Sequence, residues 1–264
     1  MTVRSIGFIG VGTLAKAMIL GLRRRWPELE VQLSPRSERL SSELAAGDQK
    51  IHRWTTNAEV VAASEVVFVT VRPPQLQEAL SGTRFRPDQL VLSCLAGISI
   101  AEIKERCAPA EVARVLPIPA IERCEGPIVL CPPDARARAL FDGLGDIVDV
   151  PDEAALAAIW PCSAFMSPYF ALQAALIGWT AEQGVEHPAA ATYVRSLLKA
   201  LATTSALTEL ADLDRLIEEH ETPGGLNNRI RLQLEKAGWF AAVGDALAMT
   251  SRLRGAELTN QAKP

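Results

Sequence analysis

Ile6-Gly7-Phe8-Ile9-Gly10-Val11-Gly12-Thr13-Leu14-Ala15 is the stretch that decides the fold, because a Gly-x-Gly-x-x-Ala pattern stands between an apolar run and a helical segment. Gly10 permits a tight turn after a strand, and Gly12 lets a ligand approach the backbone closely. Small Ala15 permits close packing of the following helix on that strand. Free N–H groups at a helix N-terminus, here those of Thr13 and Leu14, bind phosphate. The stretch predicts a dinucleotide-binding turn, with a plain glycine turn as the alternative.

The residues around this turn continue a regular alternation of short apolar runs and helical segments up to about residue 150. The apolar runs lie at 5–9, 31–33, 66–71, 90–94, 113–116, 128–131 and 147–150. Runs such as Val66-Val67-Phe68-Val69 are apolar on both faces, as is typical of central strands in a parallel sheet that helices cover on each side. The pattern predicts an α/β fold with a Rossmann-type doubly wound parallel sheet.

After Pro151 the β-branched runs stop, and Ala- and Leu-rich helical segments follow at 153–183, 188–219 and 226–253. We therefore predict two domains, a dinucleotide-binding domain at 1–152 and an all-α substrate and dimerisation domain at 153–264. A few long helices without a sheet form a thin layer with exposed apolar faces. We expect a second copy of the chain to cover these faces in a homodimer, and the sequence leaves open whether dimers assemble further.

The end of the second predicted strand indicates which dinucleotide binds. In NAD-binding proteins an acidic side chain at this point binds the ribose hydroxyls, and none stands here. Ser34-Pro35-Arg36-Ser37 follows instead, and its hydroxyls and guanidinium suit a 2′-phosphate. Glu30 precedes the strand and is expected to point away from the ribose. The pattern favours NADP over NAD, with a polar loop and helix N-cap as the alternative.

Composition narrows the class of partner and the compartment. A net charge of −4 and a pI near 5.6 give no basic excess for nucleic acid, so none is expected as a partner. We expect no membrane span, because charged residues interrupt the apolar runs before about 20 residues. The five cysteines are odd in number and form no Cys-x-x-Cys pair, which favours a reducing cytoplasm. The three histidines are widely separated, so no metal is expected.

Further short motifs follow the glycine turn, at 34–37, 69–73, 93–98, 114–117, 222–225 and 234–238, with Asn57 before a helix. Together they resemble the pyrroline-5-carboxylate reductases, which reduce a five-membered cyclic imine to proline. The resemblance implies NADP(H), with Asn57 and the segment from Ser34 to Arg36 at its adenosine side. It implies that the turns containing Val71, Arg72 and Pro73, and Ala96 and Gly97, flank the nicotinamide end. It also implies a helical domain interleaved between two subunits.

The sequence departs from this family on the substrate side. Ser163–Tyr169 stands where the family has Ser-Gly-Ser-Gly-Pro-Ala-Tyr, and both glycines are gone. Leu116-Pro117-Ile118-Pro119 lacks the Asn of the family's Met-Pro-Asn-Thr-Pro. Asn227 matches the threonine that hydrogen-bonds the imine in the family. The cofactor half therefore follows the family pattern better than the substrate half does.

The candidate substrate site is the turn formed by Thr222, Pro223, Gly224 and Gly225 before a predicted helix. Its free N–H groups and the positive helix end suit a substrate carboxylate, with a simple helix cap as the alternative. Asn227 can donate to a carbonyl or accept from an iminium proton, but it does not readily relay a proton as a hydroxyl does. Tyr169 is a candidate proton donor, with packing in an apolar helix as the alternative.

These features predict an NADPH-dependent reductase acting on C=N, with pyrroline-5-carboxylate as the first candidate substrate. Two alternatives remain open. One is an imine reductase for a bulkier substrate, which the large side chains of Phe165 and Met166 suggest. The other is a catalytically inactive NADP-binding regulatory protein, which the changed substrate motifs suggest.

Overall fold

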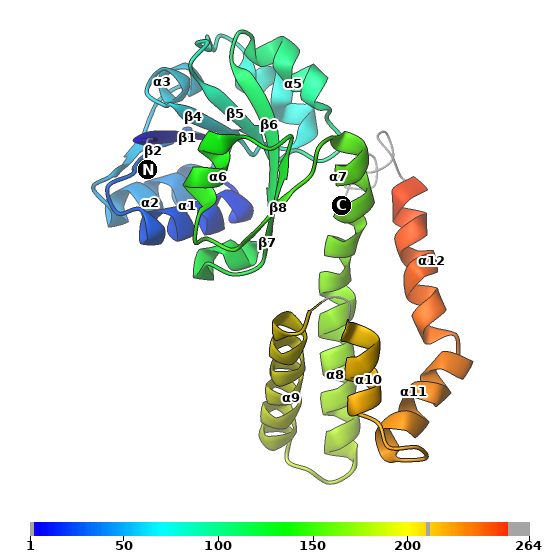
Figure 1. Cartoon of the computed structure of the whole chain (residues 1–264). Helices are drawn as coiled ribbons and strands as arrows, with labels where there is room; N and C mark the ends of the chain where they lie inside the picture. The colour runs from blue at the N-terminus through cyan, green and yellow to red at the C-terminus, as the bar shows by residue number, and fades with distance from the viewer. Residues whose placement is uncertain (1–2, 210–211, 253–264) are drawn as a thin grey trace. The chain divides into compact units, whose positions relative to one another are not determined.

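The computed structural model describes residues 3–209 and 212–252, whose helices and strands are drawn in Figure 1. They form two compact units, the first ending at Ile159 and the second running from Trp160 to Arg252. The division falls after Ile159 rather than after residue 152, because α7 (Glu153–Ile159) packs on the sheet through buried Leu156. Residues 253–264, assigned above to the helical domain, lie outside the described residues.

The described part of the first unit contains one eight-stranded sheet of order β3-β2-β1-β4-β5-β6-β7-β8 (Figure 1). The strands are β1 (Ser5–Ile9), β2 (Glu30–Leu33), β3 (Ile51–Arg53), β4 (Val66–Val69), β5 (Leu90–Ser93), β6 (Glu111–Pro117), β7 (Pro127–Cys131) and β8 (Asp146–Asp149). The predicted fold class is confirmed. The sequence pattern did not predict β3, because only Ile51 in it is buried while His52 and Arg53 are exposed.

The sheet departs from a wholly parallel arrangement at β7. Strands β1 to β6 run parallel, whereas β6 and β7 pair antiparallel, with Val115 opposite Leu130. Only residues 118–126, with the short helix η2 (Pro119–Arg123), connect β6 to β7. A parallel connection needs a crossover of about a dozen or more residues, so this link is too short for one.

Alternate side chains of the central strands enter two different cores, one on each face of the sheet. Phe8 of β1 and Phe68 of β4 stack with ring centroids 4.6 Å apart on one face. On the other face, Ile9, Val67 and Val69 form a separate buried cluster. Helices α1 (Thr13–Arg25), α2 (Glu38–Gly47) and α6 (Ala135–Phe141) contribute to the first core, and α3 (Asn57–Ala62), α4 (Leu76–Leu80) and α5 (Ile100–Cys107) contribute to the second. The sheet is therefore covered by helices on both faces.

The described residues of the second unit are helical. They form η3 (Trp160–Phe165), α8 (Met166–Glu182), α9 (His187–Leu207), α10 (Leu213–Glu219), α11 (Leu226–Lys236) and α12 (Trp239–Arg252). All three predicted segments are divided, the first of them by η3 between α7 and α8. The backbone becomes extended at Thr208 after α9, and Gly238, with φ of 74°, separates α11 from α12. A positive φ suits glycine and ends a helix.

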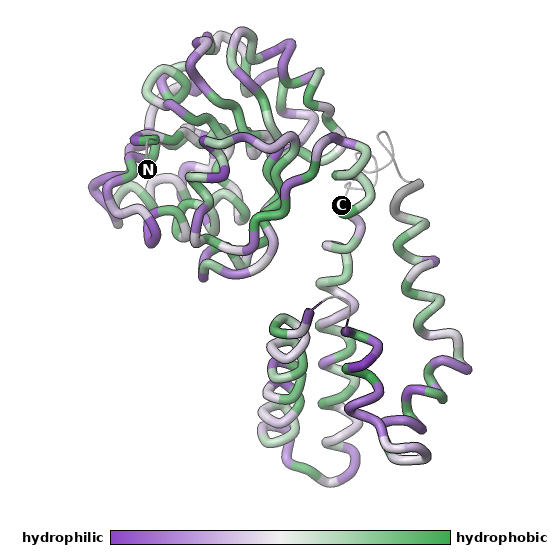
Figure 2. The backbone as a smooth tube through the Cα atoms, viewed as in Figure 1, coloured by the Kyte–Doolittle hydropathy of each residue, from purple (hydrophilic) through white to green (hydrophobic). Residues whose placement is uncertain are grey.

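The helices of the second unit bury little apolar surface. Their one described core cluster is centred on Ile177, Ala190 and Val194. Figure 2 shows hydrophobic residues along α8, α9 and α12. Many large apolar side chains in these helices are exposed, including Phe170, Trp179, Tyr193, Leu201 and Leu207.

One apolar stretch is longer than the sequence analysis expected. Within the described residues, Glu153–Glu182 is long and apolar enough to cross a membrane by length and composition. The expectation that charges interrupt every such run was wrong, because no charged residue lies between Glu153 and Glu182. One such helix is weak evidence for a membrane span, since an apolar helix of a soluble protein passes the same test.

Candidate dinucleotide site

The predicted cofactor residues come together at the carboxyl edge of the sheet. Parallel strands end at the same edge, and β3, β2, β1, β4 and β5 are neighbours in that order. The turns after these strands carry Asn57 (after β3), Ser34 and Arg36 (after β2), Gly10 to Leu14 (after β1), Val71 to Pro73 (after β4), and Ala96 and Gly97 (after β5). This edge is where open α/β sheets bind ligands.

The two glycines of the turn after β1 differ in what surrounds them. A side chain at Gly10 would clash with the protein itself, whereas a side chain at Gly12 would not. Gly10 has φ of 95°, and a Cβ there would lie 2.8 Å from Val71 Cγ1 and 2.9 Å from Val71 N. At Gly12, by contrast, a Cβ would meet no atom of the described residues within 4 Å. The space over Gly12 is therefore open for a ligand.

Gly12 is also the N-cap of α1, and no described side chain caps this helix. Gly12 and Thr13 are exposed and Leu14 is partly exposed. The first N–H groups of a helix have no partner within the helix, and they carry the positive end of its dipole. The start of α1 is thus chemically suited to phosphate.

Two hydroxyl groups hold the turn in place. Gly10 N donates to Ser34 Oγ at 2.9 Å, and Thr70 Oγ1 donates to Gly10 O at 2.5 Å. Ser34 is fully buried. Its hydroxyl, predicted from sequence as a phosphate ligand, is used inside the protein to fix the turn. Thr70, which the sequence analysis did not single out, has the corresponding role from the end of β4.

Arg36 and Ser37 are the exposed members of the loop after β2. The Arg36 side chain is 51% exposed, and its Nη1 lies 3.5 Å from Glu78 Oε2 in α4. Ser37 is the N-cap of α2, but its side chain makes no capping hydrogen bond with the described residues. The alternative that this loop serves only as a helix cap therefore gains no support.

Asn57 has an unmade hydrogen bond at this edge. Its Nδ2 donates to Ala79 O at 2.8 Å, whereas its Oδ1 is buried without a partner among the described residues. Thr56 and Glu59 already cap α3, so Asn57 is not needed for that purpose. A buried acceptor without a donor is unfavourable, and a ligand N–H or O–H would satisfy it.

The turn after β4 contains one buried and one exposed predicted residue, and the turn after β5 begins beside a buried thiol. Val71 is buried beneath Gly10, and Arg72 is exposed, its N donating to Gln75 Oε1 at 3.4 Å. After β5, burial raises the pKa of the Cys94 thiol to about 12, against the opposing effect of Arg114. The thiol is therefore protonated at neutral pH and is no nucleophile.

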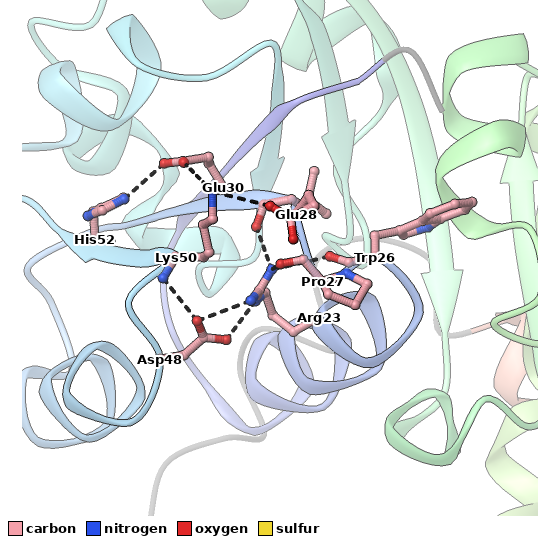
Figure 3. A network of polar contacts seen from close by, with 9 residues as sticks. Arg23, Trp26, Pro27, Glu28, Glu30, Asp48, Lys50 and His52 are labelled. Carbon is pink, nitrogen blue, oxygen red and sulfur yellow. Dashed lines mark hydrogen bonds and ion pairs between the residues drawn. The ribbon is translucent and has the colours of Figure 1, made fainter.

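Glu30 lies at the opposite edge of the sheet, as the sequence analysis expected of it. It is the first residue of β2, and its carboxylate contacts His52 at 2.9 Å and Lys50 at 3.2 Å (Figure 3). The hydrogen bond from His52, followed by that from Lys50, lowers the pKa of Glu30. Because Glu30 and Ser34 flank opposite ends of β2, Glu30 does not belong to the carboxyl-edge site.

The predicted substrate turn lies in the second unit, before α11. Gly225 N donates to Thr222 O at 2.7 Å, and Gly224 has φ of 72°. A Cβ at Gly225 would lie 2.5 Å from Thr222 Oγ1, so glycine is needed there. Gly225 is the N-cap of α11, which no described side chain caps.

Three side chains that the sequence patterns did not indicate, those of Glu221, Asn228 and Arg231, support this turn. Arg231 donates twice to the Glu221 carboxylate, which lowers the pKa of Glu221. Asn228 bridges the pair and the turn, because its Nδ2 donates to Glu221 at 2.9 Å and its Oδ1 accepts from Gly224 N at 3.3 Å. Their separation along the chain gives no sequence signal of this contact.

The two candidate catalytic side chains have different surroundings. Asn227 is exposed, and its Nδ2 donates to His220 O at 2.7 Å, which uses one of its two N–H groups. Tyr169 is partly buried in α8, with its ring 5.7 Å from that of Phe170. Asn227 follows the turn directly, two residues after Gly225. For Tyr169, no contact with this turn is found among the described residues.

No group of three or more histidine, cysteine, aspartate and glutamate residues in the described part of the chain is arranged to hold a metal ion.

Comparison with known proteins connects both units to one kind of reductase. Residues 5–97 match the family model of the coenzyme F420-dependent NADP oxidoreductases. The chain is 29% identical to the pyrroline-5-carboxylate reductase of Pseudomonas aeruginosa, over 99% of each chain.

Two solved structures have the same fold. The 1-pyrroline-5-carboxylate reductase of Streptococcus pyogenes superposes with a TM-score of 0.79 at 22% identity, covering 94% of this chain and 96% of that one. The NADP-bound pyrroline carboxylate reductase of Plasmodium falciparum gives a TM-score of 0.81 at 16% identity, covering 97% and 99%.

The doubly wound sheet with its glycine turn at the carboxyl edge defines a Rossmann-type dinucleotide-binding protein. The resemblance seen in the motifs is confirmed, because the chain is similar to pyrroline-5-carboxylate reductases over nearly its whole length.

Proposed function

We propose that this protein is an NADPH-dependent reductase of a cyclic imine, with pyrroline-5-carboxylate as the first candidate substrate and proline as its product. The observation that carries the proposal is the carboxyl edge of the sheet. There the open space over Gly12, the uncapped start of α1 and the unpartnered Asn57 Oδ1 occur together. The full-length similarity to pyrroline-5-carboxylate reductases supports the choice of substrate class.

Each part of NADP(H) has suitable residues at this edge of the sheet. The N–H groups of Thr13 and Leu14 suit the pyrophosphate, and the exposed Arg36 suits the 2′-phosphate. The unpartnered Asn57 Oδ1 would accept a hydrogen bond from the adenosine side of the ligand. The turns at Val71–Pro73 and Ala96–Gly97 flank the nicotinamide end. When bound, NADPH supplies the hydride.

The protein itself has to bind the imine and accommodate its change of charge. The N–H groups at the start of α11 and its helix dipole would hold a substrate carboxylate, and Gly224, where a Cβ would meet no described atom within 4 Å, would allow close approach. Asn227 keeps one amide N–H and its Oδ1 for the substrate nitrogen. Because an amide does not relay a proton, the proton comes from solvent, from the substrate or from Tyr169.

The test is to supply the purified protein with NADPH and either pyrroline-5-carboxylate or a larger cyclic imine. The oxidation of NADPH is measured as a loss of its absorbance. Turnover of the five-membered substrate supports the proposal. Turnover of larger imines alone would support the bulkier substrate suggested by the exposed side chains of Phe165 and Met166. Tight NADPH binding without turnover of any imine would instead indicate a regulatory protein.

We further propose that the protein is a homodimer through its helical unit. Tyr193 and Leu207 on α9 are 66% and 84% exposed, and Trp179 on α8 is 63% exposed, which is unusual for such large apolar side chains. A second copy laid on these helices would bury them. The same contact would give the apolar stretch Glu153–Glu182 a protein partner, so that the protein would be soluble. The free cysteines of the described residues favour a reducing cytoplasm. Light scattering after size-exclusion chromatography measures the mass of the assembly, and a monomer would contradict the proposal.

A further inference from the structure

Arg114 is a largely buried cation between apolar residues of β6. It belongs to β6, where its neighbours Ala113 and Val115 are buried, and its own side chain is only 12% exposed. In the register of the sheet it lies beside Ser93, the last residue of β5. Arg114 is therefore next to the point where the chain leaves β5 for the turn containing Ala96 and Gly97.

The guanidinium holds this turn at both ends. Its Nη2 donates to Leu95 O at 2.5 Å, and its Nη1 donates to Glu153 Oε1 at 3.1 Å. The same Glu153 oxygen accepts from Ile100 N at 3.1 Å, at the start of α5. A carboxylate is favourable at a helix N-terminus. One ion pair thus connects the first and last residues of the segment 95–100.

Stability alone is a poor explanation for this arrangement. Arg114 Nε is buried without a hydrogen-bond partner among the described residues, and an unmade bond of a buried charged donor is unfavourable. An apolar side chain at the same place would avoid this cost, and the ion pair adds little stability in return, because Glu153 is 36% exposed and partly exposed ion pairs contribute little. An apolar residue could not replace the two N–H donors, Nη1 and Nη2, which hold Glu153 and Leu95 in fixed positions.

We propose that Arg114, together with Glu153, is a positioning residue for the nicotinamide half of the cofactor. It acts through the segment 95–100, whose Ala96 and Gly97 flank the nicotinamide end in the proposed function on which this inference rests. Arg114 holds that segment in the conformation that receives the ligand, so that little ordering is left for the moment of binding.

The experiment compares two ligands in Arg114→Gln, Arg114→Lys and Glu153→Gln. NADPH occupies the whole site, whereas 2′-phospho-ADP-ribose lacks the nicotinamide ring. We expect Arg114→Gln and Glu153→Gln to raise the Kd for NADPH about tenfold and the Kd for the fragment less than about twofold. Arg114→Lys keeps the charge but only one donor nitrogen, so binding in this variant should be weakened less than in Arg114→Gln. If Arg114→Gln does not fold, the two Kd values of Glu153→Gln test the proposal in its place.

Arg23 offers a matched control at the opposite edge of the sheet. Its side chain is 13% exposed, and it also binds a carboxylate, Asp48, and backbone carbonyls, including Leu29 O (Figure 3). Arg23→Gln should lower thermal stability to a similar degree while leaving both Kd values unchanged. Equal weakening of NADPH and of the fragment by the Arg114 and Glu153 variants, or the same pattern in Arg23→Gln, would overturn the inference.

A second readout needs no ligand. Hydrogen exchange of the amides in residues 95–100 should become faster in Arg114→Gln and Glu153→Gln but not in Arg23→Gln. Unchanged exchange in the first two variants would refute the inference. A wild-type protein that binds neither ligand would refute the proposed function instead, and the exchange measurement would still decide whether Arg114 fixes this segment.

Discussion

Replacement of Arg36 by alanine should separate NADPH from NADH, because Arg36 is the exposed cation in the loop after β2. A hydrogen bond to a charged group contributes about 1.5–3 kcal/mol. The side chain is 51% exposed, so solvent screening reduces this to about 1–2 kcal/mol. The Kd for NADPH should then rise about 5- to 30-fold, as measured by nucleotide fluorescence titration, while that for NADH stays within about twofold.

Two further variants, Glu78→Gln and Arg39→Ala, test whether the effect on NADPH is specific to Arg36. Glu78 lies 3.5 Å from Arg36 and competes for it, so Glu78→Gln should lower the Kd for NADPH and leave that for NADH unchanged. Arg39 is a matched control, because it lies in the same region, is 92% exposed and pairs with Glu43. Equal losses of both nucleotides in Arg36→Ala, or the same selective loss in Arg39→Ala, would refute the assignment of the 2′-phosphate to Arg36.

Three other expectations concern the turn, the opposite edge and the helical unit. Gly12→Ala should retain the melting temperature but weaken NADPH binding more than about tenfold, whereas Gly10→Ala should lower stability by about 1–3 kcal/mol in urea unfolding. Asp48→Asn should be destabilising by about 1 kcal/mol at neutral pH, because the hydrogen bond from Arg23 lowers the pKa of Asp48. The stability that this contact gives is present above the unfolded pKa of about 3.9 and is lost as pH falls through the folded pKa, so the two proteins should converge in acid unfolding once the pH is below that folded pKa. Trp179→Glu should give monomers in light scattering, and a dimer of unchanged strength would place the interface elsewhere.

The class of the fold and the position of the glycine turn could be predicted from the residues alone. Both depend on local chemistry: runs apolar on both faces, such as Val66–Val69, form buried parallel strands, and Gly10 and Gly12 permit backbone geometry that other residues resist. The same locality explains the failures. The strand β3 has a single buried residue, Ile51, which is too short a signal, and the antiparallel β7 follows from the length of a connection rather than from any residue type.

Which polar groups of the candidate site are free for a ligand could be seen only once the strands and turns were placed in space. Ser34 and Arg36 are equally plausible phosphate ligands in the sequence, yet the Ser34 hydroxyl accepts from Gly10 N while Arg36 stays exposed. Likewise, the contacts from Arg114 to Leu95 and to Glu153 join residues far apart in the chain. A hydrogen bond depends on distance and direction in space, and residue identity along the chain fixes neither until the strands have been placed side by side.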